Sequence, residues 1–552
     1  MLMVALLLLL QVAVLLGIGH WVLRRGLQLP SQPLEAILLL AMGITGLLTH
    51  GLSIFFPVDE TTQWLVLLIG LTAWIDPAFY TSLRQYQNRL QPLSPPEKGL
   101  LLCLILTAVT LAAGPILRDD TESYHLQNIH WIREYGTVPG LANLHSRLGF
   151  NSIWFHTTAI LTPFSEYNFY TTPNTLLSLL MASAMLVPFS PKLAHQTPIR
   201  LAKLLTLLGL FICWYYWRGN IQSANYDYYF TTTTVLFFLL CREKVLSRYD
   251  LLQWALMLPP ILICIRPLYL PTLLFSLYAL YQYALSKKYR IVFFYALGAS
   301  LTAMLFFYRN YILSGHPLYP SQLLSLTNPA WQVPIQQIDS LQQYIRHFVW
   351  PANMNGWSGW IGWIEHLYTY DLMFIVLGML GGIINLIQIR KQSIPFPFLV
   401  GAVLTLQLAL WFGISPEPRF IAGVFVVGQF LLYQNLLHLI QTPTLPAATI
   451  QKLLVVVFIF LNVGLLYGKW TRERSNYTNV IWPQALPKPE SHIFTKQGIE
   501  FHIPENWNGN WNARCYLTPL PCVYDTLPGV RPLGKKIEEG FYVEEYQKRN
   551  IP

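Results

Sequence analysis

The apolar run LLLCLILTAVTLAAGPIL, residues 100–117, ends abruptly at the charged run RDDTESYH, residues 118–125. An apolar run of this length is typical of a helix that crosses a bilayer. Three carboxylates and a histidine within eight residues are unusual in a chain of which only 11% is charged. We therefore expect a transmembrane helix that delivers Asp119, Asp120 and Glu122 to one face of a membrane.

Apolar runs of similar length recur along the whole chain. The protein has 552 residues and is 54% hydrophobic, and its charged fraction is less than half of the roughly 25% usual in soluble proteins. The pattern predicts an all-α polytopic membrane protein with about fourteen transmembrane helices. We expect N-terminal helices in residues 1–98, a core in residues 99–468 with outer loops 118–168 and 309–369, and a small irregular or β-containing cap in residues 469–552.

Two early runs carry specific expectations. Residues 2–23 lack a positively charged start and a small-residue cleavage site, which favours a retained transmembrane helix over a signal peptide. Residues from about 62 to 82 form a single apolar run, and we expect one helix there.

Charge sets the expected orientation. Arg24-Arg25, Lys287-Lys288 and Arg390-Lys391 lie in short loops between apolar runs, and such basic loops are usually cytoplasmic. Both chain ends and the acidic run then lie outside. This rule also accounts for the net charge of +10 without a nucleic-acid partner.

Two of the six cysteines stand apart from the apolar runs. Cys515 and Cys522 lie in the polar tail, on the predicted outer side, where a disulfide can persist. The alternative is a pair of free thiols. The other four cysteines lie in or beside apolar runs, and we expect them to pack in the core.

The acidic run can carry chemistry in two ways. Asp119 or Asp120, with Glu122 and with Asp227 from a later outer loop, can act as a general base, or the aspartate pair can bind a divalent cation through oxygen ligands. The alternative is that Asp120 or the next residue caps a short helix over residues 121–135. His125 in the same run is a candidate for substrate binding.

A second dense run, GLANLHSRLGFNSIW, covers residues 140–154. It mixes hydrogen-bonding groups with aromatic rings, a mixture suited to binding sugar hydroxyls and stacking on sugar faces. The candidates for substrate binding here are Asn143, His145, Arg147, Asn151 and Trp154. The alternative is a loop packed on the helix bundle.

Three arginines each follow an apolar run on the expected outer side: Arg266, Arg309 and Arg419. Arginine binds phosphate with a planar, two-pronged donor group, so these residues are candidates for holding the phosphate of a lipid carrier. They can instead reach toward lipid headgroups. His316 lies in the same outer segment as Arg309.

Several short motifs resemble those of GT-C-type glycosyltransferases, polytopic enzymes that use polyprenyl-phosphate-linked sugars. In chain order they are Asp119-Asp120 with Tyr124-His125, Asn225-Tyr226-Asp227, Arg309-Asn310-Tyr311 with Ser314-Gly315-His316-Pro317-Leu318-Tyr319-Pro320, and Pro418-Arg419-Phe420. The run 140–154, together with Cys515 and Pro521-Cys522, also resembles a narrower family of bacterial integral membrane proteins associated with cell-surface polysaccharide. Three apolar runs precede the acidic loop here, whereas the GT-C core usually has one.

The resemblance implies a GT-C-like fold in a bacterial inner membrane, with an active site facing the periplasm. It implies transfer of a sugar from a polyprenyl-phosphate carrier to a glycan, lipid or protein acceptor, with membrane lipid as the surroundings. Two alternatives stay open: a polysaccharide polymerase or O-antigen-ligase-type enzyme that relies on arginines and histidines, and a transporter or flippase for lipid-linked sugars.

Overall fold

The fold is taken from a computed structural model. It describes residues 1–29, 32–163, 166–189, 197–213, 216–243, 245–325, 327–347, 357–367, 369–389, 395–439, 447–472, 481–505 and 514–544. Arg390 and Lys391, which carry part of the orientation argument, lie outside these residues.

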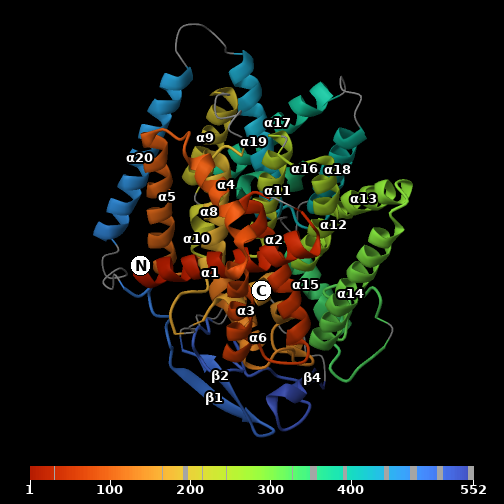
Figure 1. The fold of residues 1–552 in the computed structure, drawn as a ribbon. Coiled ribbons are helices and arrows are strands. Elements are labelled where there is room, and N and C mark those ends of the chain that lie inside the picture. Colours follow the sequence, from red (N-terminus) through yellow and green to blue (C-terminus); the bar gives the residue numbers. More distant parts are fainter. Residues whose placement is uncertain are drawn as a thin grey trace.

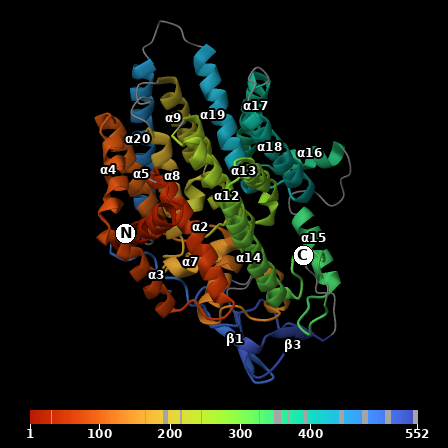
Figure 2. The ribbon, with the colours of Figure 1, turned by 45° about the vertical axis from the view of Figure 1, so that its right-hand side comes forward.

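The described chain is mostly helical, and a small region with strands lies at one end of the helix bundle (Figures 1 and 2). The helices are α1 (Leu2–His20), α2 (Leu34–Ser53), α3 (Glu60–Thr72), α4 (Tyr80–Leu90), α5 (Pro95–Ala113), α6 (Leu126–Glu134), α7 (Ile153–Leu161), α8 (Thr172–Leu186), α9 (Thr197–Ile212), α10 (Arg218–Ile221), α11 (Asp227–Arg242), α12 (Arg248–Ile265), α13 (Leu273–Leu285), α14 (Tyr289–Ser314), α15 (Ile335–His347), α16 (Trp357–His366), α17 (Thr369–Ile389), α18 (Pro395–Ile414), α19 (Ala422–Leu439) and α20 (Ala447–Arg472).

Seven of the described helical segments are long and apolar enough to cross a membrane. They are Leu2–Gly26, Leu34–Ser53, Pro95–Ala113, Arg248–Ile265, Tyr289–Ser314, Pro418–Leu439 and Thr449–Thr471. Three shorter apolar helices, Thr172–Leu186, Asp371–Ile384 and Leu399–Ile414, accompany them. Such a set of helices is typical of a membrane protein.

The expected single helix over residues 62–82 is wrong in shape. Helical segments Glu60–Ile75 and Pro77–Leu90 meet at a bend of 88°. The Asp76 side chain accepts a hydrogen bond from the Ala78 backbone N–H at 2.9 Å and caps the second segment. Proline suits the first position of a helix because it has no backbone N–H to donate, so Asp76-Pro77 ends one segment and starts the next.

Buried ion pairs join helix ends on the side of the bundle away from the strands. Arg89 at the end of α4 donates two hydrogen bonds to Glu35 in the first turn of α2, at 2.8 and 3.0 Å. Lys203 of α9 lies 2.9 Å from Glu243, the residue after α11. Burial makes the loss of one partner costly, so these pairs fix how the helices are aligned.

Two helices approach each other through glycines. A Cβ atom added at Gly381 of α17 would lie 1.8 Å from the Gly428 carbonyl oxygen of α19, and one added at Gly428 would lie 1.9 Å from the Gly378 oxygen. Small residues allow such close contact between membrane helices. α19 is thereby held tightly at a fixed distance from α17.

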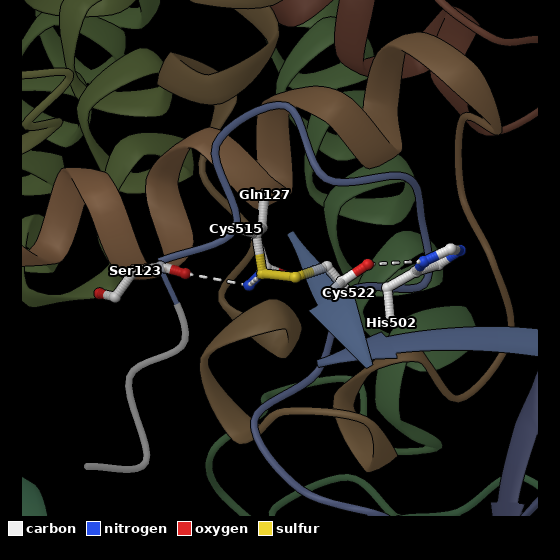
Figure 3. The surroundings of a disulfide bond; sticks show 6 residues. Ser123, Gln127, His502, Cys515 and Cys522 are labelled. Atoms are coloured by element: carbon white, nitrogen blue, oxygen red, sulfur yellow. Dashed lines mark hydrogen bonds between the residues drawn. A yellow bond between two sulfur atoms is a disulfide. The ribbon is translucent and has the colours of Figure 1, made fainter. Parts of the chain in front are cut away.

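The cap predicted for the tail contains two small antiparallel sheets. One pairs β1 (Ser491–Lys496) with β2 (Ile499–Pro504), and the other pairs β3 (Val530–Pro532) with β4 (Phe541–Val543). A disulfide joins Cys515 to Cys522. Figure 3 shows Gln127 of α6 pointing at this disulfide, and its amide nitrogen lies 2.9 Å from the Cys515 sulfur.

The cap and the helix after the acidic run share one hydrophobic core. Trp131 of α6 packs in a buried cluster with Phe501 of β2 and Phe541 of β4. Asn143 donates hydrogen bonds to the backbone oxygens of Trp331 and Phe541, at 2.9 and 3.1 Å. The last part of the chain therefore holds the two dense polar runs in place.

Candidate functional site

Four charged residues from distant parts of the chain line one pocket. They are Asp120 after α5, Arg147 in the second dense run, Arg266 at the end of α12 and Arg419 just before α19. Aromatic rings complete most of the lining: Tyr124, Phe150, Tyr226, Tyr344 and Phe420. We call this the arginine pocket.

Asp120 lies at the centre of its charge network. Its Oδ1 atom accepts a hydrogen bond from Arg147 at 2.9 Å, and its Oδ2 atom accepts one from Arg419 at 2.7 Å. Burial raises the pKa of this carboxyl group, but Arg419 and Arg147 outweigh burial and hold the pKa well below its usual range. Asp120 is therefore ionised while both arginines contact it.

The chain before Asp120 explains how it reaches the pocket. α5 ends at Ala113, and Pro115 and Leu117 are held by hydrogen bonds with Gln222 at 3.2 and 3.3 Å. Asp120 then precedes a helical turn, Thr121–His125, but its side chain makes no capping bond there. Neither form of the capping alternative is what the structure shows, because the Asp120 carboxylate faces arginines, and the Thr121 hydroxyl lies beside His125 and accepts from the Ala224 backbone N–H.

Arg419 is positioned by a rigid loop. Trp411 of α18 donates to the Glu417 carbonyl oxygen at 2.7 Å, and Trp363 of α16 donates to the Pro416 carbonyl oxygen at 3.2 Å. The Glu417 carboxylate also lies 3.7 Å from the Arg419 guanidinium. Burial raises the pKa of Glu417 although Arg419 opposes this change.

Arg147 is held by its own loop and by α15. The Nδ1 atom of His145 accepts a hydrogen bond from the Arg147 backbone N–H at 3.1 Å. The guanidinium donates to the Tyr344 hydroxyl at 3.2 Å and lies over the Tyr124 ring, 5.0 Å from its centre. His145 thus supports an arginine of the pocket rather than lining it.

Arg266 pairs with Asp227, the first residue of α11, at 2.6 Å. The Tyr269 hydroxyl also donates to the same Asp227 oxygen, at 3.3 Å. The Arg266 guanidinium lies over the Phe420 ring, 3.4 Å from its centre. Asp227 therefore acts behind the pocket, where it fixes Arg266, and is not among the residues that line it.

Asp119 and Asp120 point in different directions. The Asp119 side chain is 82% exposed and lies 3.4 Å from Arg514 of the cap, as does the carboxylate of Glu122. Both oxygens of Asp120 are meanwhile held by arginines. The aspartate pair therefore does not fit a divalent-cation site, and the described residues contain no cluster of three or more acidic, histidine or cysteine side chains that could hold a metal ion.

His125 is buried directly behind the pocket. Its Nδ1 atom lies 3.0 Å from the Thr121 hydroxyl, and its ring packs on Tyr124, Phe155 and Tyr226. Burial lowers its pKa to about 3, although the charge of Asp120 works in the opposite direction. His125 is therefore neutral near pH 7, and its Nε2 atom makes no hydrogen bond within the described chain.

Three of the predicted binding residues lie in other buried surroundings. Arg309 of α14 donates to Asn151 at 2.8 Å and to Thr137 at 3.0 Å. Trp154 is fully buried and donates to Asn174 of α8 at 3.0 Å. Arg309, Asn151 and Trp154 are absent from the pocket lining.

Asn143 and His316 hold loops together. Asn143 bonds to the cap, as described above. The His316 ring lies 2.7 Å from the Ser325 hydroxyl and 2.9 Å from the Val333 carbonyl oxygen. Neither side chain lines the arginine pocket.

Sequence reasoning did not select several of the aromatic residues that line the pocket. In the sequence, Tyr226 and Phe420 stand out only as members of motifs around charged residues, and Tyr344 of α15 belongs to no motif. The available signal was position, because Tyr226 and Phe420 directly adjoin Asp227 and Arg419. Tyr344 has no such neighbour in the sequence.

The fold and the site together define a membrane protein with an arginine-rich pocket at the end of its bundle that carries the cap. The chain belongs to the family described as a domain of unknown function, DUF8201, whose model matches residues 1–426. This range includes every residue that lines the pocket and excludes the cap. No curated protein and no solved structure matches the chain.

Proposed function

We propose that this protein is a membrane glycosyltransferase that takes a sugar from a polyprenyl-phosphate carrier. The acceptor is a glycan, lipid or protein at the outer face of the membrane, in the synthesis or modification of a cell-surface glycan. The observation that carries the proposal is the meeting of a carboxylate, three arginines and several aromatic rings in one pocket. A base, phosphate ligands and stacking surfaces are the groups that such a transfer needs.

Each charged group has a role in the proposed reaction. Asp120 accepts the proton of the acceptor hydroxyl, whose oxygen bonds to the anomeric carbon of the sugar. The bond from that carbon to the donor phosphate breaks, and its electron pair leaves with the phosphate. Arg147, Arg266 and Arg419 stabilise the charge that develops on the leaving phosphate. Asp227 orients Arg266.

The proposal includes the arrangement in the membrane. A GT-C-like core with about fourteen transmembrane helices would place the pocket and the cap in the periplasm of a bacterium, as the distribution of basic loops predicts. The ion pairs of Arg89 and Lys203 lie at the opposite end of the bundle, where that orientation puts the cytoplasm. The disulfide in the cap agrees with an oxidising outer compartment.

The test compares the two neighbouring aspartates. Asp120→Asn should lower sugar transfer by at least about 100-fold, which is the low end of what a general base contributes. Asp119→Asn should retain transfer within a few-fold, because the Asp119 side chain is exposed and outside the pocket. In a strain without the wild-type gene, Asp120→Asn should abolish the cell-surface glycan while lipid-linked sugar accumulates. Intact glycan with Asp120→Asn would refute the assigned base.

The composition of the pocket favours one second candidate. Three arginines and a single carboxylate line it, and a polysaccharide polymerase or ligase that relies on arginines would use the same residues for phosphate binding. For such an enzyme, Asp120→Asn would remain largely active and Arg419→Gln would not. The two substitutions measured side by side therefore separate the two functions.

A further inference from the structure

The base proposed above is weak in the arrangement that the structure shows, because two arginines hold its carboxylate. A general base must be basic enough to take the proton that it removes. Each carboxylate oxygen of Asp120 instead accepts a hydrogen bond from a different arginine, at 2.9 and 2.7 Å, and two guanidinium groups that stabilise the charged form make the carboxylate a weak base. The Asp120 side chain is only 19% exposed, so water shields these contacts weakly.

The arginines are grouped closely enough to share one anion. Arg266 and Arg419 both lie against the Phe420 ring, at 3.4 and 5.4 Å from its centre, so their guanidinium carbons are at most 8.8 Å apart, the sum of the two distances. Arg147 and Arg419 meet on the single carboxylate of Asp120. Two oxygens of one planar group therefore occupy the positions where two oxygens of a phosphate would bind the same arginines.

The arginines also lack freedom to move away. Arg419 follows a loop that two tryptophans hold by hydrogen bonds, and Arg147 is fixed by the Tyr344 hydroxyl. Apart from its bonds to these two arginines, the Asp120 side chain makes no capping bond to the helical turn that it precedes. When an anion enters, the group that gives way is therefore the carboxylate.

Resting on the proposed function, we infer that the phosphate of the donor displaces Asp120 from Arg147 and Arg419. Asp120 is a temporary occupant of the phosphate site, and donor binding releases it to act as the base. Binding then follows an order, with the donor before the proton transfer from the acceptor. An acceptor that arrives alone meets a carboxylate whose basicity the two arginines suppress.

The inference predicts that removing the acid strengthens donor binding. Asp120→Asn leaves a neutral group of the same shape that competes weakly for the arginines. Hydrogen bonds between charged groups are strong enough that we expect the affinity to rise at least about ten-fold. The measurement is calorimetric titration of the purified full-length protein in detergent with geranyl diphosphate and, separately, with inorganic pyrophosphate.

Two further variants complete the experiment. Asp339→Asn changes an exposed carboxylate of α15 outside the pocket, and its affinity for both probes should equal that of the wild type. Arg419→Gln removes a ligand and should weaken binding at least about ten-fold, which tests the site even if Asp120→Asn fails to fold. A gain with both probes assigns recognition to the phosphates, and a gain with geranyl diphosphate alone shows that the apolar chain is also needed; both support the exchange.

Equal or weaker binding of both probes by a folded Asp120→Asn protein would overturn the inference. So would unchanged binding by Arg419→Gln. These outcomes do not depend on turnover, since the probes carry no sugar. A protein that binds the probes as predicted but transfers no sugar would retain the exchange and lose the proposed function.

Discussion

The close contact between α17 and α19 can be tested with two adjacent glycines. A Cβ atom at Gly381 would lie 1.8 Å from a backbone oxygen of α19, whereas ordinary contact begins near 3.4 Å. Gly381→Ala therefore forces the two backbones apart by about 1.6 Å, the difference between these distances. A neighbouring backbone cannot rotate away as a side chain can.

Gly382 provides the matched control on the same helix. No atom lies within 4 Å of a Cβ atom added there. Gly382→Ala should raise the free energy of unfolding by up to about 1 kcal/mol, because alanine favours a helix over glycine. Gly381→Ala makes the same gain but incurs an overpacking cost of about 1–3 kcal/mol or more. The two variants should therefore differ in stability by at least about 1 kcal/mol.

The assay is thermal inactivation of both purified proteins in one detergent, followed by the fraction that remains monodisperse after heating. We expect Gly382→Ala to survive at the highest temperature, then the wild type, then Gly381→Ala. A Gly381→Ala protein as stable as Gly382→Ala would refute the close approach of the two backbones. Because membrane proteins often unfold irreversibly, the order of the three proteins is compared at one heating rate.

Two further predictions concern the cap and the pocket. Replacing Cys515 and Cys522 by serine opens a loop with a sequence separation of 7, which should destabilise the cap by about 2 kcal/mol; faster cleavage of the cap by added protease measures this, and unchanged cleavage would count against it. Burial lowers the pKa of His125 from 6.5 to about 3, so the unfolded chain binds a proton at this residue more readily than the folded protein does. The contribution of neutral His125 to the free energy of unfolding is therefore fully present above pH 6.5 and declines as the pH falls toward 3. Between pH 7.5 and pH 5 the loss is about 2 kcal/mol, and His125→Gln should remove that part of the pH dependence of unfolding; an unchanged dependence would contradict the buried, neutral state.

The sequence predicts the mostly helical chain, but in the described residues seven helical segments are long and apolar enough to cross a membrane, where about fourteen were expected. The run 100–117 corresponds to α5, and the expected helix over residues 121–135 ends one residue earlier, at Glu134. Apolar content averaged over the run hides the bend between α3 and α4. Asp76-Pro77 marked the break, since a capping aspartate before a proline is a helix-start signal.

The site was only partly predictable, because the sequence does not show where each side chain points. Two adjacent aspartates have the same composition signal, and only the packing of the following turn sends Asp120 to the arginines and Asp119 to the cap. Arg309 follows an apolar run, as Arg266 does, yet hydrogen bonds to Asn151 and Thr137 hold it outside the pocket. The aromatic residues that line the pocket do not stand out in the sequence, because 14% of the chain is aromatic.

Because α6 and the cap share one hydrophobic core, that core can form only after the cap has been synthesised. Gln127 and Cys515, which touch in the finished protein, are 388 residues apart in the chain. At about 5–20 residues per second, the ribosome needs roughly 20–80 s to make the residues between them. During that interval Trp131 lacks its packing partners in the cap, and the cap does not yet cover the acidic loop. Residues of the cap thus complete the surroundings of a loop that is synthesised several hundred residues earlier.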